Sequence, residues 1–211
     1  MLQGLKKAGF DHVRTKGSHV AYRNSAEKLQ MNIRGRRRAD LERCTDVLAA
    51  VHHADAYPLN WPADPYGWLC PEGLLNAWIA ENAGATVAGH LALVRLKPPV
   101  VSDLAASRPL AAVSRLFVAP TFRRQSVGRR LLAQAQEWAG ARELDLILDV
   151  VDSKRSGAVA LYEATGWQFT HLSQAGWTAP DGEPVWLRHY RYPPEAGSVR
   201  TAGGGRGAGT G

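Results

Sequence analysis

The segment from residue 113 to residue 167 constrains the fold most strongly, because apolar strands and amphipathic helices alternate along it. Helices that alternate with apolar strands cover both faces of a sheet. The pattern therefore predicts an α/β fold whose central sheet lies between helices. The expected elements of this half are strand 112–118, helix 126–140, strand 145–151, helix 156–164, strand 167–172 and strand 184–191.

The first half of the chain supplies further elements of the same sheet. Apolar residues recur at helical spacing from Asp40 to Asp55, so this segment is expected to form an amphipathic helix. A strand-like piece precedes it at 31–34, and a hairpin that turns near Asn82 follows it, with strands at 77–81 and 86–96. The proline-rich stretch 57–65 and the segment 97–110 are expected to be loops.

Composition divides the chain into three parts. Residues 1–30 carry six Lys or Arg against two acids, whereas residues 31–194 carry eighteen against sixteen. The Gly-rich segment 195–211 has almost no apolar residue to bury, so it is expected to be disordered. We predict a 1–30 extension, one domain at 31–194 and a 195–211 tail. Because the net charge of the domain at 31–194 is close to zero, we do not expect a nucleic-acid partner.

Several classes of protein are disfavoured by what the sequence lacks. The chain contains no apolar run of about 18 residues, and its first ten residues do not read as a signal peptide. Cys44 and Cys70 do not have the spacing of metal ligands or of a disulfide framework. We therefore expect a cytoplasmic protein without a membrane span or a metal site.

A basic turn joins the strand at 112–118 to the helix at 126–140. Backbone N–H groups at the start of a helix are unpaired and favour negative charge. The side chains of Arg123, Arg124, Arg129 and Arg130 add charge-assisted donors, and Gly128 allows the backbone to approach a ligand closely. The turn therefore predicts a phosphate site formed by Arg123, Arg124, Gln125, Ser126, Val127, Gly128 and Arg129.

The turn and its flanks resemble the GNAT acyltransferase superfamily. The strand Val113–Pro120, the basic turn and the helix Ala158–Trp167 carry the resemblance, which extends over about residues 31–193. It implies a mixed, mostly antiparallel central sheet with helices on both faces. It also implies that the turn binds the pyrophosphate of acetyl-CoA, and that Leu116, Phe117 and Val118 meet the pantetheine.

The same resemblance implies catalytic roles. Tyr162 matches the tyrosine that protonates the departing thiolate, and a backbone amide near Phe117 or Val118 polarises the thioester carbonyl. We predict His90 as a candidate general base. The alternatives left open are Asp149, Asp152, His189 and a relay through bound water, because each of these side chains lies on or just beyond a central strand.

Three positions depart from the family pattern. Ser126 replaces the usual first glycine of the turn, at a cost of about 1 kcal/mol if the position needs positive φ. Its hydroxyl could offset part of that cost by capping the helix or by donating to phosphate. Arg155 replaces an asparagine that contacts the donor, and Ser114 replaces an acidic base.

The acceptor is expected to lie among the first helix, the loop after it and the last hairpin. Tyr57, Trp61, Trp68 and Trp177 offer flat apolar walls there, which would suit an aromatic or aliphatic amine. The predicted function is acetyl transfer from acetyl-CoA to a small-molecule or peptide amine. The first alternative is an acyl-CoA-binding module without turnover. The sequence leaves open whether the chain forms a homodimer.

Residues 1–24 resemble a truncated HicA-type mRNA interferase toxin. The segment Leu5–Arg23 reads as a helix start, a stop at Gly9 and a hairpin with a Gly-Ser turn. His19 matches the catalytic histidine of that family. However, about thirty residues cannot build the toxin core alone, so RNA binding or cleavage is the second alternative.

Overall fold

The computed structural model describes residues 10–16, 19–24, 31–96, 108–152 and 157–192. The predicted Gly-Ser turn, the helix start before Gly9, Arg155 and the 195–211 tail lie outside these residues. In the N-terminal extension, β1 (Phe10–Lys16) pairs antiparallel with β2 (His19–Asn24), so the expected hairpin is present. His19 lies at the start of β2, opposite Lys16.

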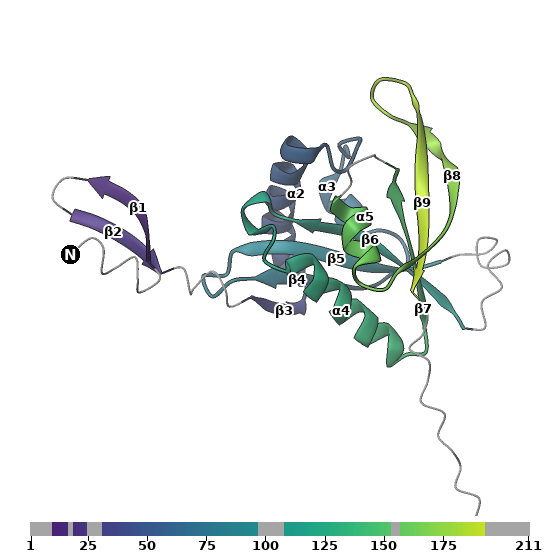
Figure 1. Cartoon of the computed structure of the whole chain (residues 1–211), viewed down its shortest axis with the longest axis horizontal. Helices are drawn as coiled ribbons and strands as arrows, with labels where there is room; N and C mark the ends of the chain where they lie inside the picture. Colours follow the sequence, from purple (N-terminus) through teal and green to yellow (C-terminus); the bar gives the residue numbers. More distant parts are fainter. Residues whose placement is uncertain (1–9, 17–18, 25–30, 97–107, 153–156, 193–211) are drawn as a thin grey trace, which may run out of the picture.

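A seven-stranded sheet forms the centre of the domain, in the order β3-β4-β5-β6-β7-β9-β8 (Figure 1). All neighbouring strands are antiparallel except β6 and β7, which are parallel. The expected mixed, mostly antiparallel sheet is confirmed. The strands are β3 (Asn32–Gly35), β4 (Leu74–Glu81), β5 (Val87–Arg95), β6 (Leu110–Val118), β7 (Asp145–Val151), β8 (Gln168–Thr178) and β9 (Pro184–Tyr192).

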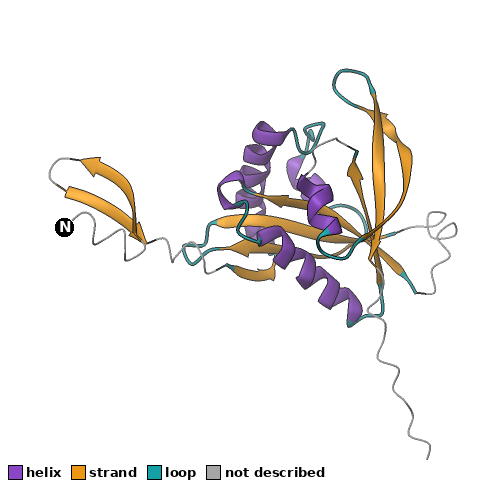
Figure 2. Ribbon diagram, in the orientation of Figure 1, coloured by secondary structure: helices purple, strands orange, loops and turns teal. Residues whose placement is uncertain are grey.

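Helices lie on both faces of this sheet (Figure 2). Successive strand residues point to opposite faces: Ile79 belongs to the core cluster of α2, whereas Ala80 belongs to the cluster of α4. The two long helices therefore bury their apolar stripes against opposite sides of β4 and β5. The helical elements are η2 (Arg38–Asp40), α2 (Leu41–Asp55), α3 (Pro65–Leu69), η3 (Pro120–Phe122), α4 (Val127–Gly140) and α5 (Gly157–Glu163).

The structure corrects two details of the expected elements. Strand β8 continues to Thr178 rather than ending at 172, because it stays paired with β9 for most of its length. A short helix, α3, follows the proline-rich loop. Asp64 caps it by accepting a hydrogen bond from the Gly67 backbone N–H at 3.0 Å, with Pro65 in the first turn. Five residues are too few for a helical period to be visible.

Helix α4 packs closely on β5 at Gly89. A Cβ atom at this position would lie 2.8 Å from the Phe117 carbonyl oxygen. It would also lie 3.1 Å and 3.2 Å from side-chain carbons of Val127 and Leu131 on α4. Glycine therefore permits α4 to pack directly on the strand that pairs with the end of β6.

We expect Gly89→Ala to lower the free energy of unfolding by about 1 to 3 kcal/mol, the usual cost of overpacking a close contact. Gly140→Ala is the matched control, because a Cβ at Gly140 meets no atom within 4 Å. That control should be neutral or slightly stabilising, since alanine favours helix. Urea unfolding of both variants measures the difference. Equal stability of the two would contradict the packing account.

Candidate functional site

The parallel pairing of β6 with β7 is short. Only Leu110–Ala112 pairs with Asp145–Ile147, and beyond these residues β7 pairs with β9 alone. The rest of β6, from Val113 to Val118, pairs only with β5 on its other side. The two strands therefore leave facing edges without a strand partner in the described part of the chain. We call this region the β6–β7 divergence.

A bulge in β6 adjoins the divergence. Between its pairs with Ala92 and His90, β6 advances by three residues while β5 advances by two, and Arg115 has a φ of 51°. Beyond the bulge, the Ala119 N–H donates to the Ala88 carbonyl on β5 at 2.8 Å. Because backbone groups alternate in direction along a strand, the N–H groups of Leu116 and Val118 point away from β5, toward the divergence.

His90 is fully buried beneath this end of β6. Its ring stacks on Phe117, with the ring centroids 5.1 Å apart. Nδ1 lies 2.9 Å from the Arg115 carbonyl oxygen, so it donates, and Nε2 accepts from the Arg36 guanidinium at 3.0 Å. Burial, together with the nearby positive charges of Arg36 and Arg115, lowers the pKa of His90 to about 3, against the hydrogen bond to Arg115. Both ring nitrogens of His90 are therefore occupied by hydrogen bonds within the fold.

Two arginines dock α3 onto the same face of the sheet. Arg115 Nε donates to the Trp68 carbonyl at 2.9 Å, and its guanidinium lies 4.9 Å from the centre of the Trp68 ring. Arg36 Nη1 donates to the Leu69 carbonyl at 2.6 Å. The short helix is thus held at its C-terminal end. Sequence reasoning missed both arginines, although a charged residue inside the apolar strand at 112–118 was a usable signal.

The predicted phosphate turn lies between η3 and α4. The backbone N–H groups of residues 125–129 have no acceptor within the described part of the chain. Arg124 and Ser126 have φ values of 57° and 58°, so the position of Ser126 does require positive φ. The Ser126 side chain makes no capping hydrogen bond, so the offset expected from capping is absent. Arg123 forms an ion pair with Asp55 at the end of α2.

Gly128 has a packing role in the first turn of α4. A Cβ at this position would lie 3.0 Å from a methyl carbon of Leu161 on α5 and 3.6 Å from Val118. The space that glycine leaves is therefore occupied by α5. Close approach of α5 to α4 places the helix that carries Tyr162 beside the end of β6.

Tyr162 is 6% exposed and lies among aromatic rings. Its centroid is 5.9 Å from that of Tyr190 and 6.1 Å from that of Trp167. Burial raises the pKa of Tyr162, and the nearby Tyr57 and Asp149 raise it further. The phenol is therefore protonated at neutral pH. Its hydroxyl has no hydrogen-bond partner among the residues that the structure describes.

The other candidate bases differ in whether their side chains already have ion-pair or hydrogen-bond partners. Asp152 pairs with Arg188 at 2.6 Å, and His189 Nε2 lies 2.7 Å from the Ser173 hydroxyl while its ring stacks on His171. Asp149 is exposed on β7. Its backbone pairs with His189 on β9, but its side chain forms no ion pair or hydrogen bond within the described part of the chain. It influences the titration of Tyr57, Tyr162 and Arg115, so it shares their surroundings.

The expected acceptor walls fall into two groups. Tyr57 packs edge-on against Trp68, with ring centroids 6.1 Å apart, close to Arg115. Trp61 instead packs on His52, and Trp177 is exposed on β8. Asn60 donates to the Thr178 carbonyl at 3.1 Å, so the loop after α2 contacts the β8–β9 hairpin.

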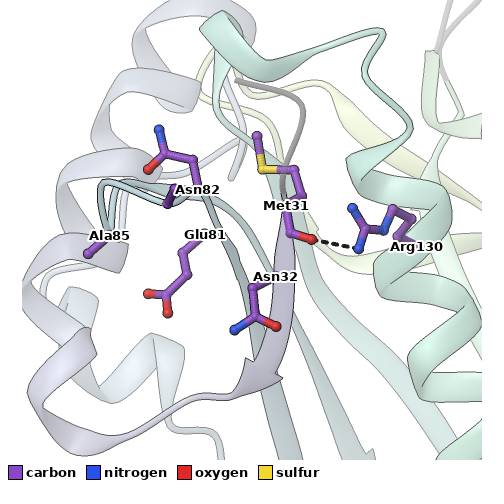
Figure 3. A pocket seen from close by; sticks show the side chains of 7 residues that line it. Met31, Asn32, Glu81, Asn82, Ala85 and Arg130 are labelled. Atoms are coloured by element: carbon purple, nitrogen blue, oxygen red, sulfur yellow. Dashed lines mark hydrogen bonds between the residues drawn. The ribbon is translucent and has the colours of Figure 1, made fainter. Parts of the chain in front are cut away.

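A hollow of about 610 Å³ lies at another place, beside the turn between β4 and β5 (Figure 3). Met31, Asn32, Glu81 and Arg130 line it together with the residues of that turn. Arg130 donates to the Met31 carbonyl at 2.6 Å, so its charge is used to hold the start of β3 to α4. Of the residues predicted to donate to phosphate, only Arg130 lines this hollow, and its guanidinium donates to Met31.

Two further absences concern the described residues alone. No helix among them is long and apolar enough to span a bilayer. No group of three or more His, Cys, Asp and Glu side chains among them is placed to hold a metal ion.

Lowering the pH from 7 to 4 should destabilise the wild type more than a His90→Asn variant. Folded His90 takes up a proton only near pH 3, whereas an unfolded histidine does so near pH 6.5. The unfolded state then binds more protons, so the free energy of unfolding falls by up to about 1.4 kcal/mol per pH unit. Asparagine keeps a donor without titrating. Urea unfolding at several pH values measures both slopes, and equal slopes would refute the buried neutral state.

Replacing Ser126 by glycine should raise the free energy of unfolding by about 1 kcal/mol, because glycine adopts positive φ without the Cβ penalty. Ser126→Ala is the control, since it removes the hydroxyl but retains the Cβ. Chemical denaturation should show a gain for glycine and none for alanine. A gain in both variants would mean that the hydroxyl, and not the backbone conformation, is the source of strain.

Comparison with known proteins identifies the family of this chain. The sequence matches the Acetyltransferase (GNAT) family over residues 44–167, more than half of the chain. It is 24% identical over 152 residues to an uncharacterised protein of Mycobacterium leprae (strain TN), covering 71% of this chain. The chain spans only 38% of the length of that relative.

Solved structures share the fold at low sequence identity. The ribosomal-protein-S18-alanine N-acetyltransferase from Escherichia coli matches with a TM-score of 0.61 at 18% identity, covering 81% of this chain and 98% of its own. Arabidopsis thaliana NAA60 in complex with a bisubstrate analogue gives 0.61 at 17%, covering 77% and 97%. A GCN5-related N-acetyltransferase from Kribbella flavida gives 0.59 at 21%, covering 77% and 97%. The chain belongs to the GNAT acetyltransferase family.

Proposed function

We propose that this protein transfers the acetyl group of acetyl-CoA to an amine acceptor at the β6–β7 divergence. The observation that carries the proposal is the convergence of three features there. These are unpaired amides at the start of α4, the strand edge of β6 with no partner, and a buried protonated tyrosine on α5. Family membership supports the reaction type, and the solved relatives include NAA60 in complex with acetyl-CoA.

The donor side fits the turn and the free edge of β6. Adjacent unpaired N–H groups at a helix start favour the two negative charges of a pyrophosphate. Arg124 and Arg129 are not ion-paired to described residues, so their charges are available to phosphates, whereas Arg123 is held by Asp55. The outward N–H and C=O groups of Leu116 and the C=O group of Val118 would pair with the amides of a pantetheine arm, as a neighbouring strand would.

The acyl transfer needs a polarised carbonyl and a proton donor. The Val118 N–H, which points toward the divergence, would donate to the thioester oxygen. The amine nitrogen forms a bond to the acetyl carbon while the carbon–sulfur bond breaks. Tyr162 gives its proton to the departing sulfur and becomes a phenolate. The nitrogen loses one proton to the base, and this proton returns through solvent to the phenolate, so the products are an N-acetylated amine, the free thiol and the restored phenol.

Asp149 is the side chain that best fits removal of the amine proton. His90 has its Nε2 lone pair occupied by Arg36 and a pKa near 3, which argues against the base role predicted for it. Asp152 and His189 are engaged with Arg188 and Ser173. Asp149 is exposed, without a direct partner among the described residues, and electrostatically coupled to Tyr162. It would act directly or through one bound water.

The alternative of a binding module without turnover makes a different prediction for the same assay. Both functions require calorimetric binding of acetyl-CoA to the full chain. Only the enzyme releases free thiol faster when an amine is added. Binding without amine-dependent thiol release would favour the module, and absence of binding would exclude both.

Tyr162→Phe should lower the turnover number by about 10² to 10⁴ while leaving the Kd for acetyl-CoA nearly unchanged, because it removes only a proton donor. Tyr192→Phe is the control, since Tyr192 is a neighbouring aromatic that packs on Trp167. Thiol release with a saturating amine and calorimetry of acetyl-CoA provide the two readouts. Full activity of the Tyr162 variant would exclude its role as the acid.

A further inference from the structure

Arg115 has donors that the fold does not use. Its Nε donates to Trp68 and its Nη1 donates to the Ser114 hydroxyl. The Nη2 group has no acceptor, and no carboxylate forms an ion pair with Arg115, among the residues that the structure describes. Burial lowers the pKa of this half-buried guanidinium. A buried charge without a paired anion is unfavourable, so this site favours a ligand that supplies one.

The position of Arg115 ties it to the reacting end of β6. It occupies the bulge, one residue before Leu116 and three before Val118. Its guanidinium is fixed by the stacked Trp68 ring on one side and by its hydrogen bonds on the other. A guanidinium that is already ordered loses little entropy when its free edge binds a planar carboxylate.

Asp149 supplies the opposite charge in the same surroundings. It stands on β7, across the divergence from β6, with no direct partner among the described residues. The charge of Asp149 acts on Arg115, and both act on Tyr57. A cation and an anion that are close enough to interact, yet are not in contact, can each receive one end of a dipolar ligand.

We propose that the acceptor is an amine that also carries a carboxylate, such as a free amino acid, with the carboxylate on Arg115 and the amino group near Asp149. This inference rests on the proposed acetyl transfer and names its substrate class. The product is the N-acetylated amino acid with its carboxylate unchanged. The Tyr57 and Trp68 rings next to Arg115 offer an apolar face for the side chain of an aromatic or aliphatic amino acid.

A matched substrate set tests the proposal on the wild-type chain. Thiol release from acetyl-CoA is measured with phenylalanine, phenylalaninamide and phenethylamine, which share a side chain but differ in the carboxylate. We expect kcat/KM for phenylalanine to exceed those for the other two by about 10- to 100-fold, the range for one charge-assisted contact. Equal values would overturn the proposal while leaving acetyl transfer intact. No amine-dependent release would instead contradict the proposed function itself.

Variants show whether Arg115 causes the preference. The readout is the ratio of kcat/KM for phenylalanine to that for phenylalaninamide within one protein, which a general loss of activity or of folded protein does not change. Arg115→Met should bring the ratio close to one, and Arg115→Lys should restore part of it. Arg142→Met is the control, because Arg142 also stacks on a tryptophan, Trp138, and donates to its carbonyl, but at the far end of α4. An unchanged ratio in Arg115→Met would overturn the assignment.

Discussion

The three-residue parallel pairing between β6 and β7 is the constraint on which the rest of the domain depends. A longer pairing would satisfy the backbone groups of Val113 to Val118 on both sides and would close the sheet. The short pairing instead leaves one edge of β6 unpaired beside the start of α4. The bulge at Arg115 adds to this effect, because an inserted residue bends and twists its strand. Unpaired backbone groups in this region need water or a ligand as a partner.

Buried polar and charged side chains on the α3 side of β5 and β6 hold the bulge and the free edge of β6 in place. His90 connects the bulge to Arg36, and the two arginines connect the sheet to the C-terminal end of α3. Removing the imidazole would leave the Arg115 carbonyl and the Arg36 guanidinium without their buried partner, which costs more than one hydrogen bond contributes. The histidine inside an apolar strand therefore has a structural explanation that requires no proton transfer.

Periodicity alone predicted the order of the elements from β6 onward, because all of these strands and helices except β8 bury apolar residues. It missed α3, which is too short for a period, and the full length of β8, which is exposed along most of its residues. In the site, the local pattern predicted a basic turn between a strand and a helix. The positive φ of Ser126 was only a conditional expectation, because it came from the glycine that the GNAT family has at this position. Arg36, Arg115 and the engagement of His90 could not be predicted, because they depend on which strands become neighbours. Those contacts join residues that lie 25 to 54 positions apart.

The proposed donor side uses mainly backbone groups, whereas the proposed acceptor side uses side chains. This difference explains why the family can be identified at low sequence identity. The proposed donor side uses N–H and C=O groups at the start of α4 and along β6, and these groups do not depend on which side chains follow. Besides the cationic side chains of Arg124 and Arg129, its sequence requirement is for small residues where helices meet strands, such as Gly89 and Gly128. The proposed acceptor side uses side chains of α3, β6 and β7. Solved relatives at 17 to 21% identity can therefore share the fold with this chain while their acceptors differ, so the acceptor has to be inferred from Arg115, Asp149 and their neighbours in this chain.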